Sequence, residues 1–130
     1  CTGLTSVTIP NSVTNVGDRA FYNCTGLTSV TIPNSVTNVG DCAFYDCMGL
    51  TSVIIGNSVT RIGSSTFWGC LNIEKITIPT AVTSIGNYAF WNCRALTTIR
   101  YKGSKEQWNT ITKESSWDDL TGNYTIVYNA

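Results

Sequence analysis

The chain has 130 residues, of which 12% are charged, a formal net charge of zero and no histidine. This length predicts a single domain, and the low, balanced charge argues against a nucleic-acid binder, which needs a basic stripe, and against a polybasic membrane-surface binder. No run in the sequence approaches the roughly 18 apolar residues of a membrane-spanning helix, and the lack of histidine removes the commonest general base and metal ligand.

One pattern recurs every 23 residues along the chain. Three residue types each keep one position in it, namely Cys1, Cys24, Cys47, Cys70 and Cys93; Phe21, Phe44, Phe67 and Phe90; and Gly17, Gly40, Gly63 and Gly86. A fixed period of about 20 to 29 residues indicates a solenoid whose coils stack on one another. We therefore expect a mainly β repeat solenoid of about five 23-residue coils over residues 1–103.

Each coil divides into three pieces. The first alternates apolar residues with serine or threonine, as in Leu27, Val30 and Ile32, which predicts a half-buried strand. The second, beginning at Val13, predicts a short strand or extended segment, with Gly17 at a sharp corner that needs a permissive φ. The third, residues 18–24, is too short for a stable helix and predicts a 3₁₀ or single-turn segment.

Stacking would bury the apolar side chains that one coil cannot bury alone. Full burial of each such side chain is worth roughly 1.5–3 kcal/mol before entropy is subtracted. The phenylalanines should also pack ring against ring, which adds about 0.5–1.5 kcal/mol per pair.

The cysteines at the shared position should form a column with neighbours about 4.8 Å apart. Because their Cβ atoms would point the same way, a reduced, buried column fits better than disulfides, which need Cβ atoms about 3.8 Å apart; one or more bridges is the alternative. Cys42 lies at a different repeat position and is expected to face solvent.

The repeat pattern breaks after residue 101. Ser104-x-x-Gln107 has the spacing of a capping box and predicts a short helix over residues 105–111, with Trp108 and Ile111 inward. Asn123–Asn129 alternates and predicts a final strand. We interpret residues 104–130 as a C-terminal cap, because an open solenoid edge would otherwise template aggregation. Residue 1 begins within a coil, so we expect further coils, a partner or edge-to-edge self-association to cover the N-terminal edge.

The repeat carries a family resemblance. Leu-x-x-Val-x-Ile matches the L-x-x-L-x-L core of leucine-rich repeats. The longer string LTSVTIPNSVTNVGDRAFYNC, residues 4–24, resembles the bacterial BspA-like subclass with its IP-x-S-V, I-G and A-F-x-x-C signatures, in register over residues 1–101. Ser12 and Val13 depart from the general pattern, so a standard asparagine ladder is not expected. The resemblance implies a leucine-rich-repeat arc, a secreted or cell-surface location, and adhesion to a host extracellular or cell-surface protein.

The outward positions of the first strand would line the concave face of such an arc, the usual binding surface of repeat proteins. Ile54, Lys75 and Arg100 interrupt the repeat there and are the candidates for specificity. The candidate binding residues are Ser6, Thr8, Ser29, Thr31, Ser52, Ile54, Lys75, Thr77, Thr98 and Arg100. Alternatively, the serines and threonines only supply soluble strand-forming residues.

A second row, Tyr22, Tyr45, Trp68 and Trp91, would suit stacking on sugars. The alternative is that these rings only cover the edge of each coil.

The sequence contains no group of residues typical of an enzyme active site. There is no glycine-rich phosphate loop, and Asp18 and Asp41 share a repeat position with Ser64 and Asn87, which indicates a polar turn column in which Asp18 bonds its own turn. We expect no catalysis, no cofactor, no metal and no nucleic-acid partner. The predicted function is a secreted or cell-surface module for protein interaction or adhesion; the alternatives are a carbohydrate-binding module that uses the Tyr/Trp row and a passive spacer domain.

Overall fold

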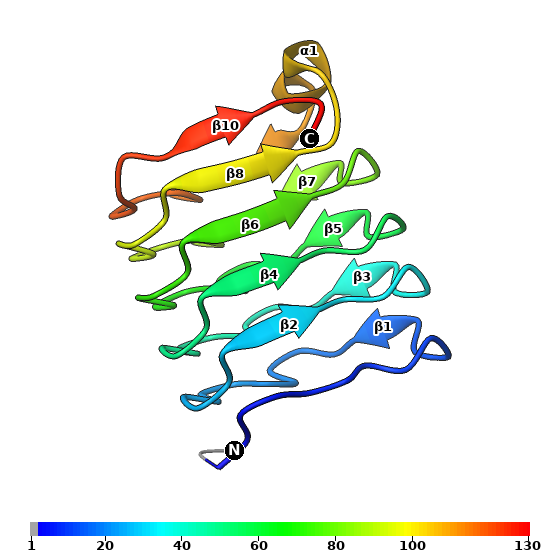
Figure 1. Cartoon of the computed structure of the whole chain (residues 1–130). Coiled ribbons are helices and arrows are strands. Elements are labelled where there is room, and N and C mark those ends of the chain that lie inside the picture. The colour runs from blue at the N-terminus through cyan, green and yellow to red at the C-terminus, as the bar shows by residue number, and fades with distance from the viewer. Residues whose placement is uncertain (1–2) are drawn as a thin grey trace.

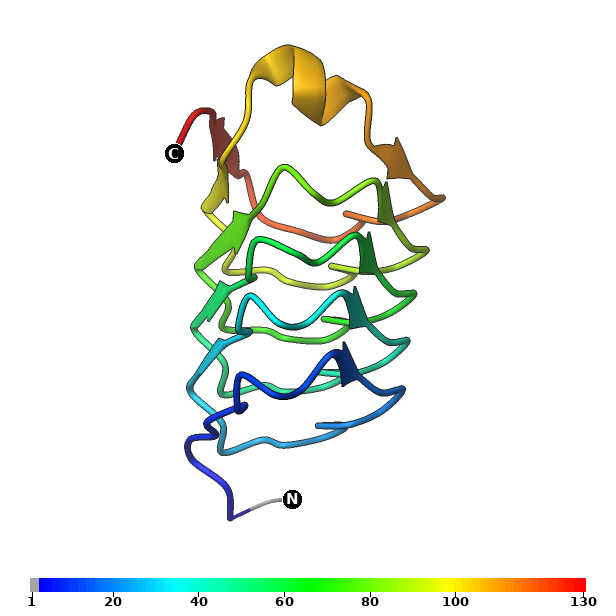
Figure 2. The same ribbon diagram turned by 90° about the vertical axis from the view of Figure 1, so that its right-hand side faces the viewer.

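The computed structural model describes residues 3–130, and its strands form two parallel sheets that run along the length of the molecule (Figure 1). The front sheet contains β2 (Ser29–Thr31), β4 (Ser52–Ile54), β6 (Lys75–Ile78), β8 (Thr98–Tyr101) and β10 (Thr125–Val127). The rear sheet contains β1 (Asn15–Val16), β3 (Asn38–Val39), β5 (Arg61–Ile62), β7 (Ser84–Ile85) and β9 (Thr112–Lys113). The coils stack with the front sheet along one side and the rear sheet along the other (Figure 2). The expected mainly β solenoid of about five coils is confirmed.

Register along the stack follows the sequence period. Val30 pairs with Val53 in the front sheet, and Val16 pairs with Val39 in the rear sheet, each 23 residues apart. In β2 and β4 the central valine is buried while its neighbours are exposed, as the alternation predicts. The core is therefore a continuous ribbon of apolar side chains between the two sheets.

The phenylalanines form the expected column through this core. Ring centroids of Phe21 and Phe44 are 5.2 Å apart, and the next two pairs are each 5.4 Å apart, with ring planes within 11° of parallel. Trp117 closes the column edge-on, 6.1 Å from Phe90.

The third piece of each coil is a chain of turns. Among the described residues no 3₁₀ helix occurs, so of the two predicted forms, a 3₁₀ or a single-turn segment, the structure shows the turn. In the second coil Cys42 and Asp46 have left-handed φ values of 57° and 62°. The amides of Cys42, Phe44 and Asp46 donate to carbonyls of the next coil at 2.9, 2.9 and 2.7 Å. Alternate N–H groups thus find partners along the stack, which a helix within the coil would prevent.

The repeated glycine is required by close approach of neighbouring coils. Gly17, Gly40, Gly63 and Gly86 do not have positive φ values, so the expectation of a permissive φ is wrong. A Cβ on Gly63 would lie 2.7 Å from the Asp41 amide nitrogen and 2.7 Å from the Gly40 carbonyl carbon. A Cβ on Gly17 would meet nothing within 4 Å, because no described coil lies against it.

Residues 104–130 contribute to both sheets. The helix α1 (Lys105–Asn109) begins at the expected capping box of Ser104 and Gln107 and ends two residues earlier than predicted. Trp108 and Ile111 are buried, as expected. The predicted final strand is β10, which pairs in parallel with β8, while β9 pairs with β7. Within residues 3–130, no helix has the length and hydropathy to cross a membrane.

The glycine finding gives a paired stability test. Gly63→Ala should lower the free energy of unfolding by about 1–3 kcal/mol, because the new methyl group meets backbone that cannot move aside. Gly17→Ala, at the same repeat position, should change it by no more than about 0.5 kcal/mol. Urea unfolding followed by circular dichroism measures both, and equal losses in the two variants would contradict close approach as the cause.

Candidate functional site

The ten candidate binding residues lie in two rows on the outer surface of the front sheet. In the first row Ser6, Ser29, Ser52, Lys75 and Thr98 are linked by strand pairing from coil to coil. In the second row Thr31, Ile54, Thr77 and Arg100 are linked in the same way, and Thr8 occupies the equivalent position of the first coil. Both rows are exposed apart from Thr77 and Thr98, which are half-buried. The structure therefore gathers these residues on one surface, and their binding role stays a prediction.

The polar side chains of these rows make no hydrogen bond or ion pair with any other residue of the described 3–130 range. The hydroxyls of neighbouring columns, in contrast, do form hydrogen bonds between coils. The hydroxyl of Thr51 donates to the Thr28 carbonyl at 3.0 Å, and that of Thr60 donates to the Thr37 carbonyl at 3.2 Å. The hydroxyls of these neighbouring columns thus tie coils together, whereas those of the two rows remain available.

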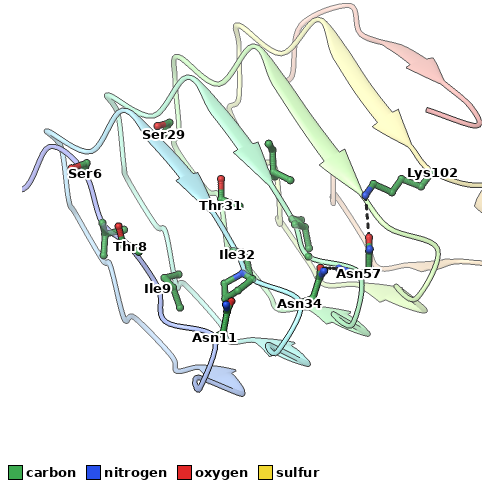
Figure 3. Close-up of a pocket in the computed structure, with 15 residues that line it drawn as sticks. Ser6, Thr8, Ile9, Asn11, Ser29, Thr31, Ile32, Asn34, Asn57 and Lys102 are labelled. Atoms are coloured by element: carbon green, nitrogen blue, oxygen red, sulfur yellow. Dashed lines mark hydrogen bonds between the residues drawn. The ribbon is translucent and has the colours of Figure 1, made fainter.

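A shallow open hollow of about 550 Å³ lies over the N-terminal half of this surface (Figure 3). The N-terminal members of both rows line it, namely Ser6 and Ser29 of the first row and Thr8, Thr31 and Ile54 of the second, and Asn11, Asn34, Asn57 and Lys102 border it. Asn34 Oδ1 accepts from the Asn57 amide at 2.8 Å, and Lys102 Nζ donates to Asn57 Oδ1 at 3.0 Å. Residues from coils far apart in the sequence therefore share one edge of the hollow.

Sequence reasoning missed several members of this surface. Asn11, Asn34 and Asn57 recur with the repeat period, which is a signal that could have found them. Thr125 and Val127 extend the two rows through the pairing of β10 with β8. Their place in the sheet had no periodic signal, because the last coil departs from the repeat.

The rings of the aromatic row stack on one another. Tyr22, Tyr45, Trp68 and Trp91 stack with centroid distances of 4.9, 4.4 and 4.7 Å and ring planes within 8° of parallel. Sugar binding uses the ring face, and these faces cover one another. Only Tyr22, at the N-terminal end of the row, is exposed beyond a third, at 45%. The geometry favours the interpretation that this row holds the coils together.

The aspartate column also holds neighbouring coils together. Asp18 Oδ1 accepts from the Asp41 amide at 2.9 Å, so Asp18 bonds the next coil and not its own turn as predicted. Asp41 Oδ1 accepts from the Ser64 amide at 2.8 Å and pairs with Arg61 at 2.9 Å. Within the described residues, no group of three or more histidine, cysteine, aspartate or glutamate side chains could hold a metal ion.

The cysteine column is largely a column of free, buried thiols. Cys1 lies outside the described residues, and Cys24 is disulfide-bonded, so the alternative of a bridge applies at Cys24. Cys47, Cys70 and Cys93 are free, and each Sγ donates to the phenylalanine carbonyl of the preceding coil at 3.1–3.2 Å. Burial raises the pKa of Cys47 to about 11 and that of Cys93 to about 12, and it also raises the pKa of Cys70.

Comparison with known proteins agrees with this architecture. The family model described as BspA type leucine rich repeat region matches residues 1–115 in six copies. A leucine rich cell surface protein from Faecalibacterium prausnitzii is 35% identical with a TM-score of 0.65, over 85% of this chain and 35% of that protein. A leucine-rich repeat protein from Eubacterium ventriosum is 27% identical with a TM-score of 0.62, over 91% of this chain and 37% of that protein.

The T. pallidum leucine rich repeat protein is 27% identical with a TM-score of 0.51, over 74% of this chain and 58% of that protein. The chain thus spans about a third to three fifths of the length of these solved structures. No curated protein matches it.

The cysteine geometry gives a labelling test. In the folded protein at about pH 8, iodoacetamide should modify the half-buried Cys42 and leave Cys47, Cys70 and Cys93 unmodified, because only accessible thiolates react. Burial raises the pKa of Cys42 as well, which slows its labelling without blocking access. Mass spectrometry of digests reads out each site, and concentrated urea should expose all four; rapid labelling of Cys70 before urea is added would contradict the buried column.

Proposed function

Because the chain belongs to the BspA-type leucine-rich repeat family, we propose that it is a non-enzymatic module that binds a protein through the outer surface of the front sheet. We place this module at the cell surface or in the secreted fraction of a bacterium, acting in adhesion. The solved F. prausnitzii relative is a cell surface protein, which supports this location.

One observation carries the proposal. The side-chain polar groups of the two front rows have no partner within residues 3–130, while the aromatic, aspartate and cysteine columns bond from coil to coil. A surface that contributes no side-chain bonds to its own fold is free to contact another molecule. The hollow over β2 and β4 adds a shaped region to that surface.

Carbohydrate binding by the Tyr/Trp row is the weaker proposal, since stacked ring faces leave only edges for a sugar. A passive spacer would show no binding at the front surface, so the following test separates it from an interaction module.

Peptides selected from a random display library on the intact chain provide the probe. Thr31→Arg places a long side chain in the hollow of the front surface, and we expect it to weaken the binding of the selected peptides about tenfold or more, by blocking close approach. Thr112→Arg is the matched control, because Thr112 is an exposed strand threonine of the rear sheet with no side-chain bond.

Biolayer interferometry measures both variants, and circular dichroism checks that they fold. Peptides that bind the wild type and Thr31→Arg equally would show that the front surface is not the binding site. A library that yields no binder through this surface would favour the spacer.

A further inference from the structure

The front surface carries positive charge without a negative counterpart. Lys75 and Arg100 lie in the two rows, and Lys102 lies two residues beyond Arg100 at the edge of the hollow. All three are exposed. The ion pair found within residues 3–130 is Arg61 with Asp41, so none of the three is neutralised by a carboxylate.

This charge is segregated, since the chain has eight basic and eight acidic residues. Neither row contains an acidic residue. Asp18 and Asp41 lie in the turn column, and Asp118 accepts from the Tyr124 hydroxyl at 2.8 Å in the last coil. Glu74 precedes Lys75 in the chain and makes no ion pair. A neutral protein that collects unpaired cations on one surface presents an attractive potential there to an anionic partner.

Lys102 is held in place over the hollow. Its ammonium donates to Asn57 Oδ1 at 3.0 Å, and the Asn57 backbone is in turn bonded to Asn34 (Figure 3). An ammonium has three N–H donors, so two remain for a ligand. Holding the side chain in advance lowers the entropy that a ligand would have to remove.

Apolar side chains lie next to this charge. Ile54, Thr77 and Arg100 pair across β4, β6 and β8, which puts Ile54 and Arg100 about 10 Å apart at two strand spacings. Ile54 is 49% exposed, and Val127, beyond Arg100 in the same row, is 39% exposed. From Thr31 to Val127, the side chains of the second row are therefore in turn hydroxyl, apolar, hydroxyl, cationic and apolar.

We propose that the segment recognised by the front surface is an acidic stretch of a protein, with an apolar side chain about 10 Å from a carboxylate. This inference rests on the proposed function and specifies its partner. The carboxylate contacts Arg100 and Lys102, and the apolar side chain covers Ile54. A nucleic acid or sulfated glycan fits less well, because a polyanion gains affinity from a long run of cations, and here exposed apolar residues interrupt the charge.

The test uses fluorescein-labelled synthetic peptides and the intact chain. One peptide alternates glutamate with leucine and polar residues, a second replaces each glutamate by lysine, and heparin serves as a sulfated polyanion. Fluorescence anisotropy is measured for wild type, Arg100→Glu, Lys102→Glu and Thr31→Arg. Lys105→Glu is the matched control, because it makes the same charge change on an exposed lysine of α1, outside the hollow.

We expect the acidic peptide to bind, the lysine peptide not to bind, and added salt to weaken the complex. Arg100→Glu and Lys102→Glu should each weaken binding about tenfold or more, while Lys105→Glu should stay within about twofold. Circular dichroism confirms that each variant is folded.

Other outcomes overturn the inference in distinguishable ways. If both peptides bind equally and Thr31→Arg abolishes binding, the front surface binds protein but does not select acidic segments. If only heparin binds and the charge reversals abolish it, the ligand is a sulfated polyanion. If neither these peptides nor library-selected ones bind through the front surface, the proposed function fails as well.

Discussion

The fold depends on hydrogen bonds that run from each coil to the next. Strand amides, alternate turn amides and several side chains find their partners in a neighbouring coil. The environment of a residue therefore depends on its neighbour in the stack as much as on its neighbour in the sequence. This constraint explains features that look unrelated. The repeated glycine keeps neighbouring backbones in contact, and left-handed residues turn amides toward the next coil. Asp18 accepts from the amide of Asp41, and buried thiols donate to phenylalanine carbonyls.

Most of the architecture could be predicted because it is periodic. The interval between phenylalanines predicted a ring column, and the alternation around Val30 predicted which side chains are buried. The capping box at Ser104 predicted the start of the helix from purely local chemistry.

The errors share a physical cause. The repeated glycine and Asp18 were interpreted within their own coil, as a corner residue and a turn residue. Instead, Gly40, Gly63 and Gly86 allow close approach of neighbouring coils, and Asp18 accepts from the Asp41 amide of the next coil. The segment is a chain of turns and not a 3₁₀ helix because only alternate amides bond within the coil, while the others donate to the next coil. The position of β10 in the front sheet could not be foreseen, because residues 104–130 carry no repeat that would reveal their partner.

The same bonds divide the surface into columns whose side chains bond along the stack and rows whose side chains do not. Columns whose side chains bond along the stack, including the Tyr/Trp row and the threonines that donate to the preceding coil, are committed to holding coils together. The two front rows contribute only their backbones. This leaves their composition free to vary without loss of fold, and it is there that Ile54, Lys75 and Arg100 interrupt an otherwise uniform run of hydroxyls.

The direction of the inter-coil bonds also determines how the molecule responds to load. The first described residues and the C-terminal residues lie at opposite ends of the stack (Figure 1), and the strand pairing bonds run from coil to coil between them. Tension between the two ends of the stack therefore acts along the hydrogen bonds between coils and pulls neighbouring coils apart. Under such tension single coils detach at low force, because no long strands have to slide past one another. Each detached coil then extends before the next one detaches.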